Sequence, residues 1–101
     1  MSKYQFTPEA LSDLFELWSY IAADSVDAAD RVEDAVHAGC RLAAERPLAG
    51  QIREDLTALP VRFWLVQPYR NCWVVYDPKT MPLRVIRVLH SARNISRILK
   101  A

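Results

Sequence analysis

Residues 61–89, VRFWLVQPYRNCWVVYDPKTMPLRVIRVL, are the most informative stretch of this 101-residue chain. They contain three runs rich in β-branched and aromatic side chains, Val61–Gln67, Cys72–Tyr76 and Leu83–Leu89, and such runs are typical of strands. The loops between them have four and six residues. Because a parallel crossover needs about a dozen residues or more, loops this short predict antiparallel neighbours.

Two helices are predicted upstream of these strands, after a short strand at Lys3–Phe6. The first helix is predicted to begin at Pro8, because proline is favoured at the first helical position and Thr7 before it can serve as the N-cap. A turn at Asp24–Ser25 separates the first helix from a second one that ends before Pro47, which predicts an α-hairpin. Apolar residues at helical spacing are expected to face the core, namely Leu11, Leu14, Phe15, Trp18, Ile21 and Ala22, then Ala29, Val32, Val36, Cys40 and Ala43.

A short helix is predicted after the last strand, from Ala92 to Lys100, with Ser91 as its N-cap. The element order is therefore β-α-α-β-β-β-α. We interpret it as an α+β fold in which an antiparallel sheet carries the α-hairpin on one face. The length is that of one domain, so residues 1–101 are expected to form a single domain.

Composition restricts the class of protein further. With 51% hydrophobic and 25% charged residues, the chain is too apolar for intrinsic disorder. No apolar run approaches the length of a membrane-spanning helix or of a signal-peptide core, so we expect a cytoplasmic protein with no membrane contact. The two cysteines, Cys40 and Cys72, lie in different segments, and no set of three or four ligands at metal-site spacing surrounds them. They are predicted to be buried free thiols, with a disulfide between them as the alternative, and no metal or other cofactor is expected.

Charge is distributed unevenly along the chain. Residues 1–50 carry four basic and nine acidic side chains, whereas residues 51–101 carry nine basic and three acidic ones. This asymmetry indicates an anionic partner for the C-terminal half, either nucleic acid or an acidic protein segment. The alternative is that the two halves neutralise each other across the fold.

Few residues suggest catalysis. With only two glycines there is no phosphate-binding loop. Helix carboxylate pairs such as Asp13/Glu16 and Glu33/Asp34 are predicted to be solvated, and His37 is predicted at the surface or its boundary. The aromatic residues of the strands are predicted to pack in or beside the core, or else to stack on bases beside arginines. They are Trp64, Tyr69, Trp73 and Tyr76, near Arg62 and Arg70.

His90 is the strongest catalytic candidate, because it ends the last predicted strand between Arg87 and Arg93. Histidine titrates near neutrality, so beside guanidinium groups it could serve as general acid or base on an anionic substrate. The alternative is a histidine that hydrogen-bonds the strand end or the following helix. Strand alternation predicts that Arg84, Ile86, Val88 and His90 share one face and that Arg87 points to the other.

Taken in order, these pieces resemble the ParE branch of the RelE/ParE superfamily of bacterial toxins. The resemblance covers nearly the whole chain and begins with Thr7-Pro8-Glu9-Ala10. Its strongest part is RVLHSARNI at residues 87–95, which is similar to the closing RVLHGARD signature of that family. Ser91 and Asn94 depart from the Gly and Asp of that signature.

The resemblance implies the toxin of a type II toxin–antitoxin, or plasmid stabilisation, system. Its partner would be a ParD-like antitoxin, usually with a ribbon-helix-helix domain, and operator DNA would be contacted only through that antitoxin. The implied target is DNA gyrase, poisoned by protein–protein contact without catalysis. The residues expected to bind target or antitoxin are Arg84, Arg87, Arg93, Arg97, Lys100, Trp64 and Trp73.

Two alternatives remain open. RelE-type relatives cleave messenger RNA on the ribosome, and a nuclease site in this chain would use His90, Arg53, Arg62, Arg87 and Arg93. A third interpretation is a degenerate member that binds its antitoxin but harms no target.

Overall fold

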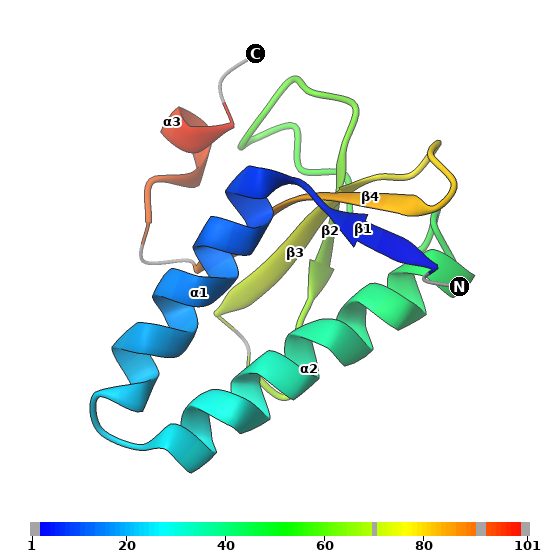
Figure 1. Ribbon diagram of the computed structural model, residues 1–101. Coiled ribbons are helices and arrows are strands. Elements are labelled where there is room, and N and C mark those ends of the chain that lie inside the picture. Colours follow the sequence, from blue (N-terminus) through cyan, green and yellow to red (C-terminus); the bar gives the residue numbers. More distant parts are fainter. Residues whose placement is uncertain (1–2, 70, 91–92, 100–101) are drawn as a thin grey trace.

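The computed structural model describes residues 3–69, 71–90 and 93–99. Its elements confirm the predicted order β-α-α-β-β-β-α. Figure 1 shows the hairpin of α1 and α2 lying across one side of the sheet, with α3 beyond the start of α1. The elements are β1 (Tyr4–Phe6), α1 (Pro8–Ala22), α2 (Val26–Glu45), β2 (Arg62–Leu65), β3 (Cys72–Asp77), β4 (Leu83–His90) and α3 (Ile95–Ile98).

The sheet has four strands in the order β1-β4-β3-β2. As predicted, β3 is antiparallel to both β2 and β4. The first strand, β1, runs parallel to β4, which makes the sheet mixed. A parallel arrangement is possible here because the α-hairpin forms part of a long crossover between β1 and the other strands.

The helices begin at the predicted caps, with one exception. The side chains of Thr7 and Ser25 accept hydrogen bonds from the backbone N–H groups of Ala10 and Ala28. The last helix is shorter than predicted, since α3 starts at Ile95 and its N-cap is Asn94. Before this helix, the Arg93 N–H donates to the carbonyl of His90. Ser91, Ala92 and Lys100 lie outside the described residues.

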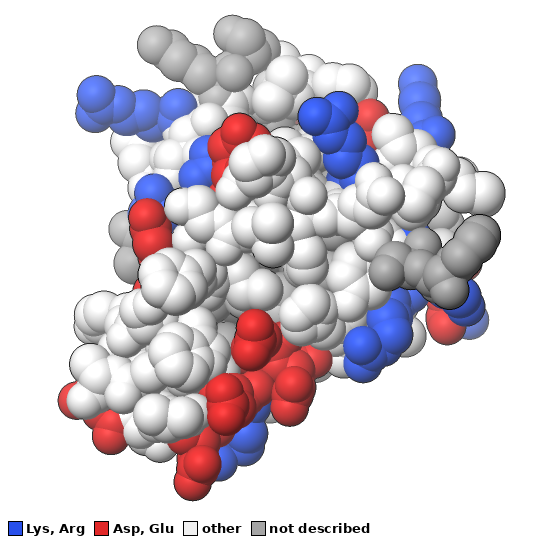
Figure 2. Space-filling model, viewed as in Figure 1, with Lys and Arg blue, Asp and Glu red and all other residues white. Residues whose placement is uncertain are grey.

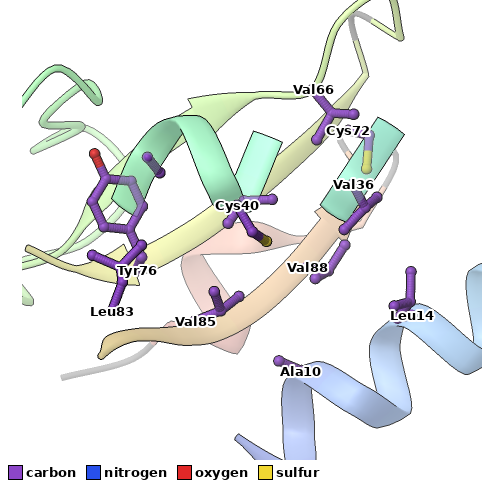
Figure 3. Close-up of a cluster of buried hydrophobic side chains, with 12 residues drawn as sticks. Ala10, Leu14, Val36, Cys40, Val66, Cys72, Tyr76, Leu83, Val85 and Val88 are labelled. Carbon is purple, nitrogen blue, oxygen red and sulfur yellow. The ribbon is translucent and has the colours of Figure 1, made fainter. Parts of the chain in front are cut away.

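Apolar side chains pack on both faces of the sheet. On the helix side, α1 and α2 contribute Leu14, Val36 and Cys40, which point towards Val85 and Val88 of β4 in Figure 3. A second cluster on the opposite face joins α3 to the sheet, and its buried members are Val61, Phe63, Val75, Leu89, Ile95 and Leu99. None of the helices in the described ranges has the length and apolarity needed to span a bilayer.

Both cysteines are buried free thiols in the helix-side cluster, which confirms the prediction. Burial disfavours the thiolate, and it raises the pKa of Cys40 to about 12 and that of Cys72 to about 11. Neither thiol is therefore a candidate nucleophile.

The apolar stripe predicted for α1 is partly wrong. Leu11 and Phe15 are 54% and 69% exposed, whereas Ala10, Asp13 and Leu14 are buried. The helix is therefore rotated so that a carboxylate, Asp13, faces the sheet. The ion pairs that Asp13 makes there supply the physical reason for this rotation.

The predicted faces of the last strand are partly wrong, because β4 contains a bulge: Val88 and His90 lie on one side as predicted, but Ile86 does not. Val75 of β3 lies opposite Arg87, and the next residue, Tyr76, lies opposite Val85, so Ile86 is an extra residue. One inserted residue reverses the alternation beyond it. The helix-side cluster consequently includes Val85 and Val88, whereas Ile86 packs against the other face.

Candidate functional site

A buried carboxylate connects α1 with the end of β4 and the segment before α3. Asp13 is 6% exposed. Its Oδ2 accepts hydrogen bonds from Arg87 Nε at 2.7 Å and from the Val88 backbone N–H at 3.1 Å. Its Oδ1 accepts from Arg87 Nη2 at 2.8 Å and from Arg93 Nη1 at 3.4 Å. Asp13 thus contacts residues that lie 74 to 80 positions later in the sequence.

This arrangement is stabilising because every part of the carboxylate is paired. A buried charge without a partner costs several kcal/mol, whereas a bidentate Arg–carboxylate pair supplies two short charge-assisted bonds. The hydrogen bonds to Asp13 raise the pKa of Arg87. The bulge residue of β4, Ile86, directly precedes Arg87 and alters the direction of side chains along the strand.

The prediction of a solvated Asp13 is therefore wrong, while Glu16, one turn later, is exposed as predicted. A signal for the burial of Asp13 is present in the sequence. Asp13 lies three residues after the buried Ala10, which places the two side by side on the helix surface. Its partner Arg87 could not be inferred in the same way, because 74 residues separate them.

A groove of about 550 Å³ lies beside this ion pair, between α1 and the end of the sheet. His90 lines it, beyond the bulge and on the same side of β4 as Val88. Its lining includes the apolar residues Leu17, Ile21, Val32 and Val88 and the polar residues Glu16, Asn71, His90 and Arg93.

A second hollow lies nearby, lined in part by Arg53, Trp73 and Arg93. The guanidinium carbon of Arg53 lies 5.8 Å from the centre of the Trp73 ring, within cation–π range. Arg53 also donates two hydrogen bonds to Asp55, at 2.9 and 2.7 Å. These bonds lower the pKa of Asp55 and raise that of Arg53.

Arg62 has a structural role instead. It donates to the carbonyl oxygens of Leu48 at 3.0 Å and Gly50 at 2.9 Å. The same turn is held by Tyr76, whose hydroxyl donates to the Pro47 carbonyl and accepts from the Gly50 N–H. Arg62 therefore stabilises the connection between α2 and β2, and it does not line the groove that contains His90.

The remaining predicted residues are spread over the molecule. Trp64 is half-buried against the helix-side cluster, and Trp73 is half-buried on the other face, edge-on to Phe63. Arg84 and Arg97 are exposed. His37 is at the boundary, as predicted, where its Nδ1 is 2.6 Å from the Tyr4 hydroxyl. Lys100 lies outside the described residues.

The five nuclease candidates do not form one cluster, because Arg62 lies apart from the other four, which are linked through Arg93. His90 and Arg93 share the groove, and Arg53 and Arg93 share the second hollow. Arg87 is paired with Asp13, and Arg62 is bound to backbone carbonyls. Within the described ranges, no cluster of His, Cys, Asp and Glu is able to hold a metal ion.

The two halves of the chain neutralise each other in part, as the second interpretation of the charge asymmetry predicts. Arg87 and Arg93 of the basic half neutralise Asp13 of the acidic half across the fold. Other charges remain segregated on the surface. Figure 2 shows acidic side chains gathered over the part where Figure 1 places α2 and its turn from α1, while most visible Lys and Arg lie towards the top and right.

Comparisons with known proteins agree with the resemblance found in the sequence. A profile of the family described as "ParE toxin of type II toxin-antitoxin system, parDE" matches residues 4–95. A solved chain of the chromosomal ParDE toxin–antitoxin system from P. aeruginosa is similar in fold, with a TM-score of 0.69 and 15% identity over 89% of this chain and 96% of that one. A comparison with curated protein sequences gives no match. The chain therefore belongs to the ParE toxin family of type II toxin–antitoxin systems.

Proposed function

We propose that this ParE-type protein poisons DNA gyrase by protein–protein contact and is neutralised by a ParD-like antitoxin. It needs no chemistry of its own for this activity. The antitoxin is expected to be of the ribbon-helix-helix type, so that operator DNA is reached only through it.

The observation that carries this proposal is the pairing of Arg87 with buried Asp13. A ribonuclease needs an acid–base group and cations that converge on one phosphate. Of the candidate cations, Arg87 is neutralised inside the fold and Arg62 holds a turn. Because these two arginines stabilise the fold, they favour a protein that acts by binding over one with a cluster of catalytic cations.

The proposed contact surface includes the exposed cations Arg84, Arg93 and Arg97, together with the accessible parts of Trp64 and Trp73. Lys100 belongs to it by prediction alone. Arg87 supports this surface indirectly, since it holds Asp13 beside Arg93. Exposed arginines and tryptophans are the side chains most often found at the energetic centres of protein interfaces.

The test uses purified protein with purified gyrase and supercoiled DNA. The protein should inhibit supercoiling and accumulate broken DNA. Arg97→Glu on α3 should weaken inhibition, whereas Arg46→Glu, an exposed arginine after α2, is the matched control and should leave it unchanged. His90→Ala should reduce inhibition only modestly, because His90 has no catalytic role in this proposal.

Cleavage of messenger RNA on programmed ribosomes, abolished by His90→Ala, would overturn the proposal in favour of the RelE-type nuclease. If the free protein affects neither gyrase nor ribosomes, yet still binds an antitoxin in a separate assay, the degenerate interpretation is correct.

A further inference from the structure

Arg93 occupies an unusual position, since it lines the groove, the second hollow and a third hollow next to Glu9 and Arg87. Its side chain is 44% exposed. Its bond to Asp13 is the longest of the four that the carboxylate accepts, 3.4 Å against 2.7–3.1 Å for the others. Arg93 is therefore the most weakly held member of the ion-pair cluster.

Release of Arg93 would leave no buried group without a partner. Arg87 and the Val88 N–H supply Asp13 with three shorter hydrogen bonds, which include the bidentate pair. Since the carboxylate stays satisfied, its burial does not oppose the release. The freed guanidinium is already accessible to solvent, so its movement needs no rearrangement of the core.

The groove beside Arg93 has the character of a side-chain pocket. Its apolar lining comes from both helices and the sheet, with Leu17, Ile21 and Val88 as central members. A volume of about 550 Å³ is ample for one or two aliphatic side chains. The cation at its rim is suited to a carboxylate held next to such a side chain.

Charges beyond the groove favour an acidic ligand on this side. The exposed Arg97 of α3 adds a second cation on this side, whereas Arg53, which lines the second hollow with Arg93, is paired with Asp55. Glu16, on the α1 side of the groove, disfavours a second acidic residue there. The complementary ligand is thus a peptide with an apolar residue in the groove, followed by Asp or Glu towards Arg93.

We propose that Arg93 exchanges its ion-pair partner when a peptide binds. It leaves Asp13 and pairs with an acidic side chain of the peptide, while the apolar residue before that side chain fills the groove. This inference rests on the proposed function, in which a segment of the antitoxin covers the toxin. It adds the chemistry of that segment, an apolar residue next to an acidic one, and the toxin residue that recognises it.

Three blocked tetrapeptides test the proposal on the intact protein. They are acetyl-Ala-Leu-Asp-Ala-amide, the neutral acetyl-Ala-Leu-Asn-Ala-amide, and acetyl-Ala-Ser-Asp-Ala-amide, which lacks the apolar residue. Binding is followed by ¹H–¹⁵N NMR at millimolar peptide. The Leu-Asp peptide should shift the resonances of Leu17, Ile21 and Val88 and the side-chain Nε–H of Arg93. It should bind about threefold more tightly than the Leu-Asn peptide, as expected for an exposed ion pair, and about tenfold more tightly than the Ser-Asp peptide, which buries no apolar side chain.

Variants identify the recognising residue. Arg93→Gln should remove the preference for Leu-Asp over Leu-Asn, and added salt should reduce it. Arg46→Gln is the matched control, because Arg46 is also exposed but does not line the groove, and it should keep the preference. Equal affinities for Leu-Asp and Leu-Asn, shifts confined to other parts of the molecule, or no shifts at all would each overturn the proposal. None of these outcomes depends on gyrase, so failure here is distinguishable from failure of the proposed function.

Discussion

Replacement of Asp13 by Asn is the perturbation whose effect the structure predicts most sharply. The substitution keeps the shape of the side chain but removes the charge. Arg87 donates to both carboxylate oxygens, at 2.7 and 2.8 Å, and the amide nitrogen of Asn replaces one of these oxygens and cannot accept, so one of the two bonds is lost and the other no longer ends on a charged group. A hydrogen bond to a charged group contributes about 1.5–3 kcal/mol. Arg87 is 20% exposed and recovers part of its hydration, so we expect a loss of about 3 kcal/mol in the free energy of unfolding, at the lower end for a broken buried ion pair.

For a domain of this size, such a loss lowers Tm by roughly 15 °C. The measurement is chemical denaturation followed by Trp fluorescence, with thermal melting as a second readout. Glu16→Gln is the control, since Glu16 lies one turn away on the same helix and is exposed, and it should change stability by less than about 0.5 kcal/mol. A loss of less than about 1 kcal/mol for Asp13→Asn would refute the view that this carboxylate locks α1 to β4.

The remaining predictions concern the turn after α2 and the buried thiols. Tyr76→Phe should cost about 1–3 kcal/mol of unfolding free energy, because the buried Gly50 N–H loses its acceptor and the Pro47 carbonyl its donor. Gly50→Ala should be destabilising by about 1–3 kcal/mol, since a Cβ there would collide with the Tyr76 hydroxyl, and the double variant Gly50→Ala/Tyr76→Phe should cost less than the sum. Native protein should react with Ellman's reagent at pH 8 far more slowly than unfolded protein, in which both Cys40 and Cys72 should react. Stability should fall above about pH 9, because burial raises both thiol pKa values in the folded state, to about 12 and about 11, and the unfolded chain loses these protons first.

Each of these outcomes has a contrary result. Additive losses in the double variant would show that Gly50 and Tyr76 do not interact as the structure places them. Rapid native-state labelling would contradict the burial of the thiols. A variant with alanine at both cysteines should lose part of the alkaline decline, and an unchanged decline would assign it to other groups, such as Tyr4 and Tyr76, whose pKa values are also raised by burial.

Much of the fold is predictable because its signals are local. The runs of β-branched residues correspond to β2, β3 and β4, and Thr7 and Ser25 cap the helices as predicted. Loop length correctly predicts the antiparallel pairs. These features depend on neighbours in the sequence, which a single chain displays directly.

The parts that the sequence does not predict depend on distant partners. The bulge at Ile86 has no Gly or Pro to mark it, yet it changes which side chains of β4 face the helices. The final helix is shorter than predicted because Asn94, whose side chain accepts from the Arg97 N–H, is its N-cap. Among the candidate site residues, Arg62 and Arg87 look equivalent to Arg93 in the sequence, and only the carbonyl and carboxylate groups beside them distinguish their roles.

The central claim, that this ParE-family protein acts by binding gyrase, is tested most directly in cells. The chain is expressed without antitoxin, and DNA and protein synthesis are followed separately by pulse labelling. The account predicts that DNA synthesis stops first and that a DNA-damage response follows, while translation continues. An early loss of translation with cleaved messages, or normal growth while the protein accumulates in soluble form, would contradict it.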